Sequence, residues 1–115
     1  MKGIEQIKWL CYGNHPQTSE YRDIAEEIIN FLRRDEELSR KRLMELLDMN
    51  PESEKDKDKF YNILRPLRGN KGSNPLDITV ISTYERDGNT FYYLSREGYD
   101  ASVNSMNGTV RYALD

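Results

Sequence analysis

The sequence predicts an α+β domain in which several helices are followed by a two-stranded β-hairpin. Apolar residues recur at helical spacing as far as Leu67, whereas β-branched and aromatic residues dominate from about residue 77 onward. Asp87-Gly88 divides this second region and is a strong hairpin signal, because both central residues of a type I′ turn need positive φ. The 115 residues provide room for one domain. Its core should be small, because 37% of the residues are hydrophobic and 32% are charged.

The first helix is predicted within residues 1–18, and Gly13-Asn14-His15-Pro16 ends it. A second helix is predicted from Ser19 to Arg34, with Thr18 or Ser19 as its N-cap. The apolar positions of the first helix are Ile4, Ile7, Leu10 and Cys11. The apolar stripe of the second consists of Tyr21, Ile24, Ala25, Ile28, Phe31 and Leu32.

A third, short helix should begin after Ser39 as its N-cap and end at Asn50-Pro51. A fourth begins after Ser53, with Asp56 three residues on in a weak version of the capping box. Pro66 lacks a backbone donor, so we expect this helix to kink or end near Arg65. The apolar side of the third helix is Leu43, Leu46 and Leu47, and that of the fourth is Phe60, Ile63, Leu64 and Leu67.

After an exit loop at residues 68–72, the two hairpin strands are predicted from Asp77 to Arg86 and from Asn89 to Ser95. The expected turn pairs Arg86 with Asn89, Tyr84 with Phe91 and Ile81 with Leu94. Ser95 is a candidate N-cap for a short helix through Val103. Residues 106–115 form a tail, in which Asn107-Gly108 turns and Thr109 to Leu114 is either a last strand or a loose end.

Three helices followed by a hairpin is the layout of a winged helix-turn-helix domain, here with an extra N-terminal helix. The segments that carry this resemblance are SRKRLMELLDM, EKDKDKFYNILRPLRG and LDITVISTYERDGNTFYYLSREGYDAS. Over residues 19–105 the chain resembles the small prokaryotic and archaeal-type transcriptional regulators of this fold. The resemblance implies sequence-specific binding of double-stranded DNA, with the helix at about 53–68 in the major groove and the hairpin tip at 85–89 as the wing.

The residues themselves point the same way. Asn62 and Arg65 lie on the outer side of the fourth helix and can bond in bidentate fashion to adenine and guanine, respectively. Lys55, Lys59 and Lys71 are candidate phosphate contacts. Other candidate DNA contacts lie at the start of the third helix, on or beside the reading helix, and on the wing. They are Arg40, Lys41, Arg42, Tyr61, Arg68, Arg86 and Asn89.

The charge pattern leaves a second hypothesis open. The net charge is −3, but residues 53–72 hold 6 basic and 3 acidic residues. Asp56 and Asp58 lie among the lysines, and Glu85 and Asp87 flank Arg86, so these carboxylates would repel phosphate. A run of this kind is often only a solvated helix surface. The alternative is therefore a winged-helix protein–protein interaction module without nucleic-acid binding, and RNA binding is a minor third option.

The first helix carries more apolar surface than an extension needs, through Ile4, Ile7, Trp9, Leu10 and Tyr12. Either it packs on its own domain or it forms a dimer contact. A homodimer would suit DNA, because two reading helices can occupy successive turns of the major groove about 34 Å apart.

Other classes are not expected. No run of 18 apolar residues would span a membrane, and Glu5 interrupts a start without a small-residue cleavage site, so a cytoplasmic protein is predicted. The single cysteine, Cys11, cannot form an internal disulfide, and with His15 it makes no complete metal-ligand set. The sequence holds no Ser-His-Asp arrangement, Gly-rich phosphate loop or HExxH motif, so neither an enzyme nor a cofactor is predicted.

Overall fold

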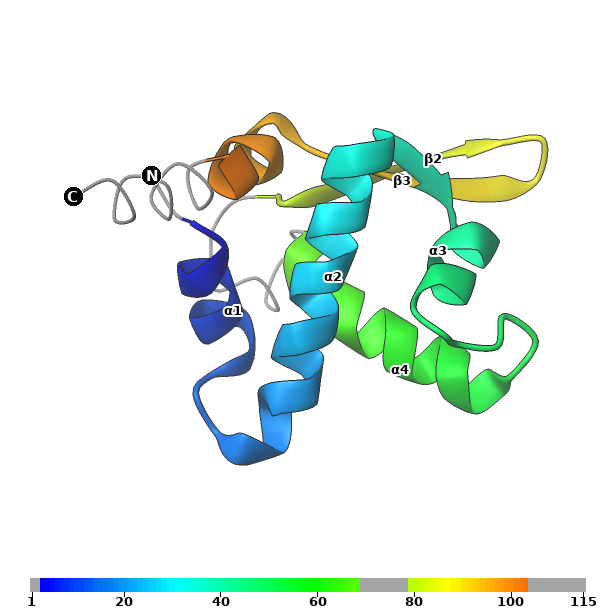
Figure 1. The fold of residues 1–115 in the computed structure, drawn as a ribbon. Helices are drawn as coiled ribbons and strands as arrows, with labels where there is room; N and C mark the ends of the chain where they lie inside the picture. Colours follow the sequence, from blue (N-terminus) through cyan, green and yellow to red (C-terminus); the bar gives the residue numbers. More distant parts are fainter. Residues whose placement is uncertain (1–2, 69–78, 104–115) are drawn as a thin grey trace.

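The computed structural model describes residues 3–68 and 79–103, which form an α+β fold (Figure 1). Its elements in chain order are α1 (Ile4–Tyr12), the short 3-10 helix η1 (Pro16–Thr18), α2 (Ser19–Asp35), β1 (Glu37–Ser39), α3 (Arg40–Leu46), α4 (Glu54–Leu64), the 3-10 turn η2 (Arg65–Arg68), β2 (Ile81–Arg86) and β3 (Asn89–Leu94). A further helix covers residues 96–103. The α+β class predicted from the sequence is confirmed. The predicted exit loop beyond Arg68 and the tail at 106–115 lie outside the described residues.

The sheet has three antiparallel strands in the order β1-β3-β2, one strand more than the predicted two-stranded hairpin, which forms β2 and β3. The additional strand, β1, places Leu38 opposite Tyr92 and Ser39 opposite Phe91. It is only three residues long and joins two helices, so no alternation of apolar and polar residues marks it in the sequence. Its hydrogen-bonding partner lies far along the chain and is invisible to any local pattern.

The hairpin itself has the predicted register. Arg86 pairs with Asn89, Tyr84 with Phe91, and Ile81 with Leu94. The turn residues Asp87 and Gly88 have φ values of 53° and 80°, as a type I′ turn requires. The strands are shorter than predicted, β2 beginning at Ile81 and β3 ending at Leu94. Ser95 caps the last helix, because its Oγ accepts a hydrogen bond of 2.9 Å from the backbone N–H of Gly98.

The helix ends match the sequence at α4 and differ at α3. Ser53 caps α4, and the helix tightens into η2 at Arg65, as the position of Pro66 predicts. Ser39 caps α3, with its Oγ accepting from the N–H of Arg42. However, α3 ends at Leu46 rather than at Asn50-Pro51. The chain leaves the helix at Asp48, which has a positive φ of 61°.

The core lies between the helices and the inner face of the sheet. The four predicted inward residues of α4 and η2, namely Phe60, Ile63, Leu64 and Leu67, are all fully buried. The ring of Phe60 meets the buried ring of Tyr92 edge-on, with centroids 5.7 Å apart. This contact joins α4 to the central strand of the sheet. Ile29 and Met44 are also fully buried, although neither belongs to the predicted apolar stripes.

The first helix packs on its own domain with one face. Ile4 and Ile7 are buried, and Lys8 Nζ pairs with Glu26 of α2 at 2.9 Å. The hydroxyl of Tyr12 donates a hydrogen bond to the carbonyl of Ile63 at the end of α4. The other face of α1 exposes Trp9, and Leu10 with it.

The residue that turns the chain from α2 into β1 is strained. Glu36 has φ 68° and ψ −55°, a conformation that L-residues adopt rarely and at a cost. Glu36→Gly is therefore expected to raise the free energy of unfolding by about 1 kcal/mol, even though glycine is more flexible in the unfolded chain. Urea denaturation followed by circular dichroism measures the change. Glu36→Ala is the matched control, because it removes the same side chain but retains Cβ. An equal gain from alanine would show that the backbone is not the cause.

Candidate nucleic-acid interface

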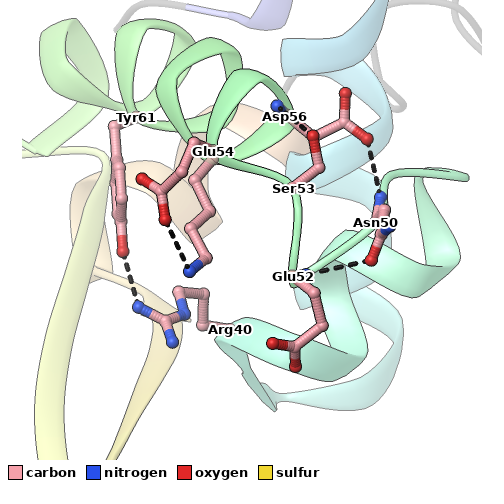
Figure 2. A network of polar contacts seen from close by, with 8 residues as sticks. Arg40, Asn50, Glu52, Ser53, Glu54, Asp56 and Tyr61 are labelled. Carbon is pink, nitrogen blue, oxygen red and sulfur yellow. Dashed lines mark hydrogen bonds and ion pairs between the residues drawn. The ribbon is translucent and has the colours of Figure 1, made fainter.

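The N-cap residue Ser53 fixes the start of α4, and the burial of one side of this helix leaves the opposite side facing outward. Asp56 is not directed outward: its carboxylate accepts a 2.8 Å hydrogen bond from the N–H of Asn50 and clamps the preceding loop to the helix (Figure 2). This carboxylate therefore has a structural partner. Asp58 remains an exposed negative charge in the middle of the face.

Lys55, Asn62 and Arg65 are exposed on this face. Their side chains make no hydrogen bond or ion pair with residues 3–68 and 79–103, so these side-chain donors are available to a ligand. Because seven and then three residues separate them, they form a stripe along one side of the helix. The stripe is about 15 Å long at the helical rise per residue.

Other predicted contacts are occupied within the molecule. The ammonium of Lys59 pairs with Glu20 of α2, so this lysine ties α4 to α2 instead of standing free as a phosphate contact. Lys59 therefore fits the predicted role of a phosphate contact poorly. The sequence does not reveal this ion pair, because helical periodicity indicates neighbours on the same helix but not on another helix. Arg68 donates a 3.3 Å hydrogen bond to Thr83 Oγ1 of β2. Lys71 lies outside the residues that the structure describes.

Arg40 and Tyr61 connect α3 to α4. Nη1 of Arg40 donates a 2.7 Å hydrogen bond to the Tyr61 hydroxyl (Figure 2). This bond raises the pKa of Arg40, so the guanidinium keeps its charge. Arg40 therefore holds a fixed position between the exposed stripe of α4 and the hairpin tip.

A groove of about 240 Å³ separates the start of α3 from the hairpin tip. Its lining residues are Ser39, Arg40, Lys41, Glu85, Gly88, Asn89 and Thr90. The groove is thus lined by two cationic side chains (Arg40 and Lys41), the hydroxyls of Ser39 and Thr90, and the amide of Asn89. It is also lined by one carboxylate, that of Glu85. The sequence predicts Arg40, Lys41 and Asn89 as separate candidates but not their proximity. The antiparallel pairing of Ser39 with Phe91 brings the start of α3 close to the hairpin. Because β1 has no sequence signal of its own, this proximity could not be predicted.

At the hairpin tip, Arg86 and Asn89 differ in their surroundings. The guanidinium of Arg86 lies over the ring of Phe91, 4.9 Å from its centroid, on the outer face of the sheet. Asn89 lines the groove and donates a long, 3.5 Å hydrogen bond to the carbonyl of Asp87. Both side chains are exposed, as is Arg42 in α3.

Two further observations concern Cys11 and the acidic side chains. Burial raises the pKa of Cys11 to about 12, so its thiol stays protonated and is a poor nucleophile. Across residues 3–68 and 79–103 no three His, Cys, Asp or Glu side chains gather to hold a metal ion. No helix in the same ranges has the length and apolar character needed to cross a membrane.

Comparison of the chain with protein-family models, with curated proteins and with solved structures finds no significant match.

Proposed function

We propose that this chain is a winged helix-turn-helix protein that binds double-stranded DNA sequence-specifically, as a small transcriptional regulator. In this proposal α4 enters the major groove, Asn62 and Arg65 contact base edges, and Lys55 contacts phosphate. The observation that carries it is the exposure of these three side chains without partners in the described part of the chain. The strand between α2 and α3 joins the hairpin sheet, an arrangement that is compatible with a winged helix.

The groove at the hairpin tip extends this surface. Arg40 lines the groove and bonds to Tyr61, which lies on α4, so the groove is tied to the helix that carries the stripe. Arg40 and Lys41 would hold the phosphate backbone while the wing, with Asn89 at its tip, lies along the duplex. Asp58 would repel phosphate but can accept a hydrogen bond from a cytosine amino group.

Selection from a library of randomised duplexes, followed by fluorescence anisotropy on the selected sequence, tests the proposal. Arg65→Ala should cut the preference for the selected sequence over a scrambled duplex by about fivefold or more, because it removes a base contact worth about 1–3 kcal/mol. Lys55→Ala should weaken both duplexes alike and lower the salt slope by about one. Arg96→Ala, in the last helix, is the matched control and should change neither.

The alternative is an interaction module for another protein, and one observation favours it. Trp9 is 56% exposed and Leu10 46% exposed on α1, beside an apolar depression of about 470 Å³ that Glu5 and Gln6 complete. A surface of this kind also suits a homodimer. If selection enriches no duplex, the DNA-binding proposal fails. If Arg65→Ala and Arg96→Ala change binding to the selected duplex alike, α4 is not the reading helix. Sedimentation of the full chain at several concentrations tests the homodimer.

A further inference from the structure

The outer face of the sheet carries a row of three aromatic rings that the proposed DNA contacts do not use. Tyr84 and Phe91 are stacked, with centroids 5.3 Å apart and planes 14° from parallel. Tyr93 adjoins Tyr84, with centroids 6.0 Å apart and planes inclined at 54°. Cross-strand pairing places the three rings on one side of the sheet, opposite the buried Tyr92.

A pocket lies at the Tyr93 end of this row, beside the connection between α2 and β1. The pocket has a volume of about 390 Å³ and is lined by Glu36, Glu37, Tyr84 and Tyr93. The Tyr84 hydroxyl donates a hydrogen bond to the Glu37 carboxylate, which fixes the orientation of both groups. This bond raises the pKa of Tyr84, so its hydroxyl remains a donor at neutral pH. The carboxylate of Glu36 makes no hydrogen bond or ion pair with any residue the structure describes.

Two of the nearby arginines, Arg34 and Arg86, are engaged elsewhere, whereas the Nε of Arg33 is buried without a hydrogen-bond partner among the described residues. Arg34 holds Asp35 through two hydrogen bonds of 3.0 and 2.8 Å, and its guanidinium lies 5.1 Å from the centroid of Phe31. Arg86 covers Phe91 at the far end of the aromatic row. The pocket therefore combines two carboxylates and two electron-rich ring faces, and none of its lining residues is a cation.

We propose that this pocket binds the guanidinium group of an arginine side chain from a partner protein. A planar guanidinium can stack on Tyr93 and donate hydrogen bonds to the carboxylates of Glu36 and Glu37. A quaternary ammonium could stack there but has no N–H to donate. The phosphates of a nucleic acid would be repelled by the same two carboxylates, so base stacking on these rings is disfavoured. None of the residues that line this pocket belongs to α4 or lines the groove beside Arg40, which the proposed DNA contacts use.

The test is a titration of the 115-residue chain with N-acetyl-L-arginine methylamide, followed by two-dimensional NMR. The matched citrulline derivative has almost the same shape but no charge. We expect the arginine derivative to shift the Tyr84 and Tyr93 ring signals in a saturable manner, with a dissociation constant of about 1–10 mM. The citrulline derivative should produce no saturable shift. If the citrulline derivative or the corresponding capped lysine binds as tightly as the arginine derivative, the assignment to a guanidinium group is overturned.

Variants locate the site. Glu36→Gln combined with Glu37→Gln should weaken arginine binding by at least about fivefold, because both charges are lost while the shape is kept. Tyr93→Ser should also weaken it, and Glu27→Gln on the exposed side of α2 is the control. Unchanged amide spectra away from the pocket establish that the variants are folded. Binding that survives the double change would overturn the proposal.

A last comparison separates the two possible sources of the guanidinium group. Free L-arginine carries an α-ammonium and an α-carboxylate where the capped derivative has two neutral amides, and both compounds have the same net charge. A site for a protein side chain offers no contacts to these charged groups, so free arginine should bind no more tightly than the capped derivative. Tighter binding of the free amino acid would overturn the assignment to a protein side chain.

Discussion

Phe60→Ala is expected to lower the free energy of unfolding by about 3–5 kcal/mol. The Phe60 ring is fully buried and meets Tyr92 and Tyr61 edge-on, at centroid distances of 5.7 and 5.8 Å. Its removal would leave a cavity between α4 and the central strand, where the backbone on both sides is held by hydrogen bonds. Because domains of this size have total stabilities of about 5–15 kcal/mol, this loss would bring the protein close to unfolding. Urea denaturation followed by circular dichroism measures it.

Phe91→Ala is the matched control for this experiment. Phe91 lies on the outer face of the same strand, β3, and is only half-buried, so the same change should cost clearly less. Equal losses at the two positions would contradict the assignment of Phe60 to the core and of Phe91 to the solvent face.

Gly98→Ala is expected to destabilise the protein by about 2–3 kcal/mol or more, although alanine normally stabilises a helix by about 1 kcal/mol relative to glycine. A Cβ atom at Gly98 would lie 2.1 Å from the carbonyl oxygen of Val80 and 2.9 Å from its carbonyl carbon. These are backbone atoms and cannot rotate away. The Val80 carbonyl also accepts a hydrogen bond of 3.0 Å from the Ser95 N–H, so it is held in place from the other side.

Thermal denaturation measures the overall effect of Gly98→Ala, and hydrogen exchange shows whether it begins in the helix over residues 96–103. Glu97→Ala, at the exposed neighbouring position, should change the stability by no more than about 0.5 kcal/mol. A stabilising Gly98→Ala would show that the last helix does not dock on Val80 as described.

The local features of the fold could be predicted because each depends on residues close together in the sequence. Ser39, Ser53 and Ser95 cap helices because their hydroxyls reach backbone N–H groups three residues later. The hairpin register follows from Asp87-Gly88 alone, since a two-residue turn determines every pair beyond it. Helical periodicity likewise separates the buried from the exposed side of α4.

The candidate surfaces could be predicted only in part. The exposure of Asn62 and Arg65 follows from the same periodicity, whereas the ion pair of Lys59 with Glu20 depends on how α2 and α4 pack. The groove beside Arg40 and the pocket beside Glu36 both require β1 to join the sheet. Sequence alone therefore determined the caps, the turn and the helix faces, which arise from interactions within a few residues. Tertiary structure decided the third strand and the sites it assembles, because a three-residue strand gains its hydrogen bonds only from a partner that folding brings beside it.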